Sequence, residues 1–157
     1  MLLRLNEAGF TMKLVFRFED ELRANPHRVA LSQALTLNAS KPNVGLKGLH
    51  GLLGSPEWWE SIQAGKMPLL FISGVVQRIY FSGQDEGGAN NTLDLKLDDG
   101  SVRAVGIYVN NSENLKLFHI GCRVSIVYAL DALKLQPAID GGVNYSKIAL
   151  EMAVSID

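Results

Sequence analysis

The sequence predicts a mainly β fold, in which a small closed barrel follows a partly helical N-terminal extension. Residues 69–156 contain five β-like segments, and one short helical stretch lies between the third and the fourth. Glycine, asparagine and Asp-Gly positions separate these segments, as is typical of short strands joined by turns. We therefore divide the chain into an N-terminal extension, residues 1–65, and a barrel domain, residues 66–157.

The extension is predicted to be helical or mixed. Residues 12–18 alternate apolar and polar side chains, which is typical of a short strand. Asn25 followed by Pro26 predicts the start of a helix, because asparagine caps helices and proline suits their first turn. The same logic applies to a Ser-Pro pair further along, which predicts a short helix over residues 56–64.

A glycine-rich arm, residues 45–54, carries a glycine at every third position. Two interpretations stay open: a connector whose leucines pack on the barrel, or an arm that becomes ordered on a partner. The two tryptophans that follow are adjacent, so on a helix they point roughly 100° apart, and one can be buried while the other faces a partner. The candidate interface residues are Leu49, Leu52, Leu53, Trp58 and Trp59.

Each barrel segment has a recognisable strand pattern. Residues 92–98 alternate strictly, and Asp99-Gly100 is a turn signal that joins them to the next segment in a hairpin. Gly74, inside an apolar segment, indicates a bulge or a sharp bend. The five segments span residues 69–82, 92–98, 101–109, 122–135 and 145–156.

This order of a strand, a hairpin, a short helix ending at Gly121 and two long strands resembles the oligonucleotide/oligosaccharide-binding (OB) fold. The resemblance covers residues 69–156 and is not specific for any one family within the fold. It implies a five-stranded Greek-key barrel with a short helix between strands three and four. It also implies a module that binds other molecules more often than it catalyses reactions.

The charge of the chain favours a protein partner over nucleic acid. The formal net charge is −1, and residues 66–157 carry eight basic against ten acidic side chains. A surface that binds phosphates needs an excess of positive charge. We therefore expect an OB-like module that mediates protein–protein contact or self-association, with a homo-oligomer as one form.

Single-stranded DNA or RNA binding is the alternative function, because OB folds commonly serve it. Aromatic side chains would stack on bases and basic side chains would contact phosphates. The candidate nucleic-acid face comprises Tyr80, Lys96, Arg103, Tyr108, Tyr145 and Lys147.

No group of residues predicts catalysis. The three histidines lie in separate segments without metal-ligand spacing, and Cys122 is the single cysteine. The paired acidic residues fall in turns or at a helix start, where solvated carboxylates are usual. We expect a protein that is not an enzyme, with no catalytic residues, no metal and no cofactor.

The hydropathy pattern predicts a cytoplasmic protein without a membrane span. No segment reaches the roughly 18 consecutive apolar residues that a spanning helix needs. The N-terminal residues are interrupted by charges, unlike the apolar core of a signal peptide. Met1 and Met12 both stay open as the native start.

Overall fold

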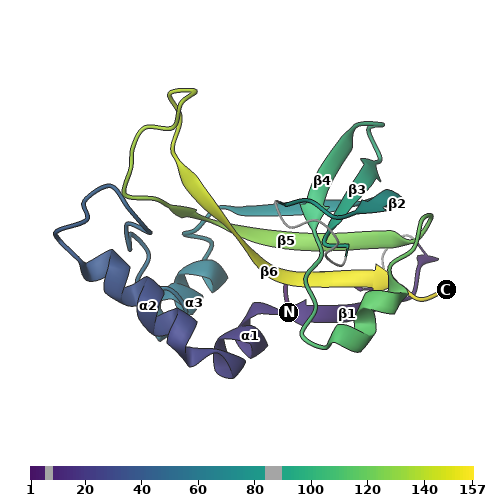
Figure 1. The fold of residues 1–157 in the computed structure, drawn as a ribbon, viewed down its shortest axis with the longest axis horizontal. Helices are drawn as coiled ribbons and strands as arrows, with labels where there is room; N and C mark the ends of the chain where they lie inside the picture. The colour runs from purple at the N-terminus through teal and green to yellow at the C-terminus, as the bar shows by residue number, and fades with distance from the viewer. Residues whose placement is uncertain (6–8, 84–89) are drawn as a thin grey trace. The chain divides into compact units, whose positions relative to one another are not determined.

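The computed structural model describes residues 1–5, 9–83 and 90–157 (Figure 1). The loop predicted after the first barrel strand includes residues 84–89, which lie outside the described residues. The described elements are β1 (Met12–Arg17), α1 (Phe18–Ala24), α2 (Pro26–Leu37), α3 (Pro56–Gln63), β2 (Leu69–Tyr80), β3 (Thr92–Leu97), β4 (Val102–Gly106), the 3-10 helix η2 (Ser112–Leu117), β5 (Arg123–Ala132) and β6 (Tyr145–Ser155).

The helices begin where the sequence places their capping residues. The side chain of Asn25 accepts a hydrogen bond from the backbone N–H of Arg28 at the start of α2, and Ser55 accepts one from Trp58 at the start of α3. Each cap satisfies a backbone donor that has no partner inside the helix. None of the described helices combines the length and the apolar composition that a membrane-spanning segment requires.

The six described strands form one open antiparallel sheet in the order β1-β6-β5-β2-β3-β4. Strands β2 to β6 lie at the positions that alternation predicted. Their arrangement into a five-stranded OB-like Greek-key barrel is wrong, because β1 and β4 are the two edges of a sheet that does not close. The fold is therefore mixed α/β.

The N-terminal strand occupies the edge of β6 at which the predicted five-stranded barrel would have closed. A closed barrel needs its two edge strands to pair, which requires a free hydrogen-bonding edge on the last strand. Strand β1 occupies that edge of β6, from Met12 opposite Ser155 to Arg17 opposite Glu151. Residues 12–18, which were predicted to form a strand, thus contribute the strand at the edge where the predicted barrel would have closed.

The described residues group into two compact units. The first contains residues 1–17, 71–127 and 151–157, and the second contains residues 18–70 and 128–150. The side chains buried in the first unit include Val76, Leu93, Leu95, Val124, Ile126, Met152 and Val154. The second unit buries Phe18, Leu53, Trp58, Ile62, Met67 and Leu150, among others. The division at residues 65 and 66 stays a prediction.

Gly74 permits a close approach between two strands of the first unit. It pairs with Leu97, and a Cβ atom there would lie 2.6 Å from the carbonyl oxygen of Lys96. Because a real side chain cannot come so near a backbone atom, glycine is required at this point of β2. The shift in register itself lies further along the strand, between Val76 and Arg78.

The glycine-rich arm packs inside the second unit. Gly45 has φ of +91°, and a Cβ on it would lie 2.8 Å from the side chain of Leu35 in α2. Leu46 bridges to Leu133 just after β5, and the backbone N–H of Lys47 donates to the carbonyl of Ala132 at 2.9 Å. The arm therefore lies between α2 and the end of β5, where glycine allows both the backbone turn and the close contact.

Candidate interaction surfaces

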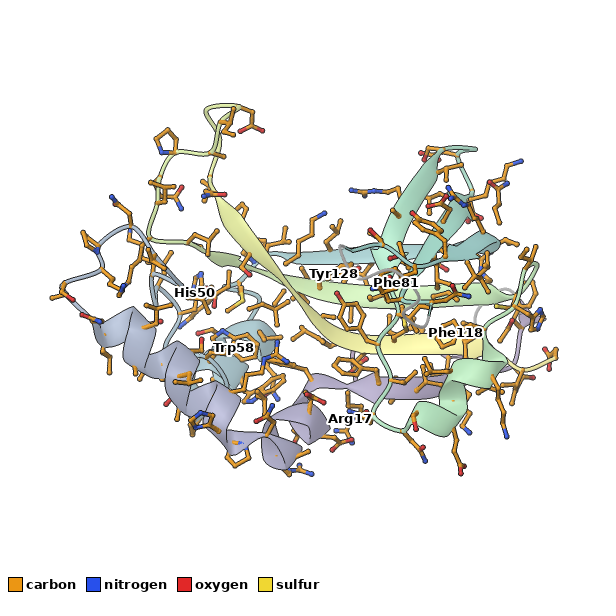
Figure 2. All side chains as sticks on the ribbon, in the orientation of Figure 1. Arg17, His50, Trp58, Phe81, Phe118 and Tyr128 are labelled. Carbon is orange, nitrogen blue, oxygen red and sulfur yellow. The ribbon has the colours of Figure 1, made fainter. Side chains whose placement is uncertain are left out.

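Three aromatic side chains form a cluster in the second unit. The rings of Trp58 and Trp59 meet edge to face at 4.9 Å, and Phe18 lies 5.9 Å from Trp58 and 6.4 Å from Trp59. Trp58, labelled in Figure 2, is completely buried. Such tilted aromatic pairs stabilise a core beyond the area they bury. Trp58 therefore holds α3 in place from inside the unit.

A buried carboxylate holds the indole of Trp58. The Nε1–H of Trp58 donates to Asp131 Oδ2 at 2.9 Å, whereas Asp131 Oδ1 has no hydrogen-bond partner among the described residues. Burial raises the pKa of Asp131, because the charged form loses its hydration; the hydrogen bond from Trp58 and the charge of His50 act in the opposite direction. The side chain ties α3 to β5.

The other candidate interface residues differ in exposure. Leu53 is buried, Leu52 and Trp59 are half-buried, and Leu49 is exposed on the arm. Trp59 lines a groove of about 440 Å³ together with side chains of α1 and α2. All five candidates lie in the second unit, and their role as an interface stays a prediction.

Tyr80, the candidate nucleic-acid residue of β2, already contacts other side chains of the sheet. The hydroxyl of Tyr80 donates to Asp94 Oδ1 at 2.8 Å, and the guanidinium of Arg78 lies 4.2 Å from the centre of the Tyr80 ring. The hydrogen bond to Asp94 raises the pKa of Tyr80, because the carboxylate stabilises the protonated phenol. A carboxylate bonded to Tyr80 opposes phosphate binding at that side chain.

The sheet register separates two of the basic candidates. Directly opposite residues of an antiparallel pair share a face. Lys96 lies opposite Val102, and Arg103 lies opposite Leu95, one position along. Lys96 and Arg103 therefore project from opposite faces of the sheet.

The remaining candidates are also dispersed. Tyr108 is half-buried in the first unit, where its ring lies 5.5 Å from that of Phe16. Tyr145 and Lys147 are exposed near the start of β6, in the second unit. The structure thus gathers no continuous strip of these six residues within either unit.

The described residues contain no cluster of three or more histidine, cysteine, aspartate or glutamate side chains that could hold a metal. Cys122 is buried, and burial raises the pKa of its thiol, which keeps the thiol protonated and unreactive.

The connection between β5 and β6 is a surface that sequence reasoning missed. It exposes Leu135, Ile139 and Val143, and Tyr145 follows at the start of β6. The signal in the sequence is an isoleucine and a valine on either side of an Asp-Gly-Gly turn. Large apolar side chains inside a turn, where a core is out of reach, are the pattern that would have indicated this surface.

Comparison with known proteins identifies the family. The model of a family described as "Immunity protein RhsI2" matches residues 12–155, from the first residue of β1 to the last residue of β6. Nothing among the curated proteins matches the chain. The predicted function was an uncharacterised OB-like binding module that mediates protein–protein interaction or self-association, with single-stranded nucleic-acid binding as the alternative. It is wrong, because the sheet is open and the matched family consists of immunity proteins.

Two of the predictions agree with this family. Immunity proteins are typically non-enzymatic, so the expectation that the chain is not an enzyme is confirmed. A protein partner, as predicted, is also what an immunity protein has. Because the match spans most of the sequence and all of its described helices and strands, the chain belongs to the RhsI2 immunity protein family.

Proposed function

We propose that this chain neutralises a cognate Rhs toxin by binding to it directly. The family match over residues 12–155 carries the proposal. A protein that opposes a toxin by non-covalent contact has to hold that toxin in a stable complex, and the immunity protein family favours this mode of action.

The surface chemistry of the chain supports a protein partner. The formal net charge is −1, and exposed apolar side chains are present on the arm and on the β5–β6 connection. Protein interfaces bury apolar anchors inside a polar rim, whereas nucleic-acid interfaces need clustered positive charge. A cytoplasmic location stays a prediction from the sequence.

Co-expression tests this function. Cells that express the toxic domain of the cognate Rhs protein should stop growing, and cells that also express this chain should grow. The toxic domain of a non-cognate Rhs protein is the matched control, and this chain should give no protection against it. The two purified proteins should elute together in gel filtration.

Protection without a complex would contradict direct binding. Growth arrest that persists when both proteins are expressed would contradict the proposed function as a whole.

A further inference from the structure

The connection between β5 and β6, residues 133–144, and the first residue of β6 expose large apolar side chains at four positions; we name residues 133–145 the β5–β6 hairpin. They are Leu135 (51% exposed), Ile139 (109%), Val143 (54%) and Tyr145 (38%). Single exposed apolar side chains are ordinary, whereas several within one short segment mark an interaction site. Figure 1 shows this segment extending beyond the ends of the two strands that it joins.

Side-chain hydrogen bonds hold the β5–β6 hairpin in one conformation. Gln136 Nε2 donates to the carbonyl oxygens of Leu133 (2.7 Å) and Asn144 (2.9 Å), and Gln136 Oε1 accepts from the backbone N–H of Asn144 at 2.8 Å. In return, Asn144 Nδ2 donates to the carbonyl of Leu135 at 3.0 Å. A loop fixed in advance loses little conformational entropy when it binds.

The tip of the hairpin is closed in the same way. The backbone N–H of Ala138 donates to the carbonyl of Gly142 at 2.8 Å, and the N–H of Gly142 donates to Asp140 Oδ1 at 2.9 Å. These bonds close a tight turn around Ile139, and the Ile139 side chain is fully exposed to solvent.

A lysine fastens the base of the hairpin to α2. Lys134 Nζ donates to the carbonyl oxygens of Leu35 (2.6 Å) and Lys41 (3.0 Å), at and after the C-terminal end of that helix. Carbonyls at a helix C-terminus lack partners within the helix and attract a cation. The charge of Lys134 is thus bound to carbonyl oxygens within the second unit, and these bonds fix the base of the hairpin to the end of α2.

The composition of the hairpin points to an uncharged, concave partner surface. Between Leu135 and Tyr145 the single ionisable side chain is Asp140. A membrane or a nucleic acid would be met by free lysine and arginine side chains; residues 135–145 contain neither, and Lys134 is bonded to carbonyl oxygens at the end of α2. A rigid, protruding loop with an apolar tip fits a cavity on another protein, as long antibody loops fit concave epitopes.

We propose that the β5–β6 hairpin is the element that docks on the Rhs toxin, with Ile139 entering an apolar cavity of the toxin and Leu135, Val143 and Tyr145 packing around its rim. This inference rests on the proposed function and assigns it to one surface.

The affinity of the purified toxic domain of the cognate Rhs protein for variants of this chain tests the inference, measured by isothermal titration calorimetry. Ile139→Asp should weaken binding by about 100-fold or more, and Ile139→Ala by about tenfold, as for an interface anchor. Ile120→Asp is the matched control: Ile120 is 69% exposed, lies between η2 and β5 in the first unit, and should bind within about twofold of wild type.

A further variant addresses the fixed conformation of the hairpin. Gln136→Ala removes three hydrogen bonds from the base and leaves every apolar side chain in place. It should weaken toxin binding about three- to tenfold through the entropy of ordering the loop. All the substituted side chains are exposed, so we expect each variant to fold. Thermal unfolding of the free variants verifies this.

The outcomes separate the two levels of proposal. Wild type that binds no toxin overturns the proposed function and the docking assignment together. Wild type that binds tightly while Ile139→Asp binds equally well overturns the docking assignment alone. Equal weakening by Ile139→Asp and Ile120→Asp, or dissociation of a dimer by Ile139→Asp without a change in toxin affinity, also overturns it.

Discussion

At the scale of single residues, Asp131 couples the stability of the second unit to pH. Its carboxyl group is buried, one oxygen accepts from Trp58, and the other has no partner among the described residues. An ionised carboxylate at this position has lost the hydrogen bonds of water to Oδ1, and no described residue replaces them. Burial therefore raises the pKa of the carboxyl group, although the hydrogen bond from the indole and the charge of His50 act in the opposite direction.

The Asp131→Asn variant should gain stability relative to wild type as pH rises. Because burial raises the pKa of Asp131 in the folded chain, the folded state holds the proton more tightly than the unfolded state. Wild type therefore loses stability as pH rises from the pKa of the unfolded state, about 4, through the raised pKa of the folded state. Each tenfold difference in proton affinity between the two states corresponds to about 1.4 kcal/mol of unfolding free energy. Asparagine does not titrate.

Urea denaturation at pH 4 and pH 7 measures this difference. The unfolding free energy of Asp131→Asn minus that of wild type should be larger at pH 7. The same difference at both pH values would contradict a raised pKa.

At the scale of elements, Asn110 protects the outer edge of β1. Its backbone N–H donates to the carbonyl of Val15 at 3.0 Å. Its side chain accepts from the N–H of Arg17 at 2.7 Å and donates to the carbonyl of Arg17 at 3.1 Å, as a strand neighbour would (Arg17 is labelled in Figure 2). Unpaired strand edges invite association with other chains, and this segment covers the end of one.

Asn110→Ala should destabilise the chain by about 1–2 kcal/mol, because two side-chain hydrogen bonds to β1 are lost. Chemical denaturation gives the free energy of unfolding. Asn43→Ala, at an exposed position after α2, is the control and should stay within about 0.5 kcal/mol of wild type. An Asn110→Ala variant as stable as this control would show that β1 does not depend on the contact.

At the scale of the whole molecule, binding to a toxin should stabilise the fold. A partner that binds the folded chain alone shifts the unfolding equilibrium by mass action. With free toxin at 100 times its dissociation constant, the gain should be about 2.7 kcal/mol, which differential scanning calorimetry detects as a rise in the unfolding temperature. The non-cognate toxic domain at the same concentration should give no rise.

An unfolding temperature that the cognate toxin leaves unchanged, at concentrations where the chain protects cells, would argue for protection by a route other than a stable complex.

Much of the local structure was predictable from the sequence. The starts of α2 and α3 follow from Asn25 and Ser55, whose side chains cap helices within three residues of themselves. The strands follow from the alternation of apolar and polar side chains, which indicates the face of the sheet on which each side chain lies. The candidate site was harder to predict: the isoleucine and valine beside the Asp-Gly-Gly turn are visible in the sequence, but the exposure of Ile139 also depends on where the hairpin lies in the fold.

Short stretches of sequence therefore determine the position and type of most helices and strands. They also indicate a chemistry suited to binding. The open sheet is a property of the folded chain, because β1 and β6 pair across residues as distant as Met12 and Ser155. Alternation is the same for a strand in a barrel and a strand in an open sheet. Capping and alternation depend on interactions over a few residues, whereas strand neighbours and surface exposure depend on contacts between segments far apart in the chain.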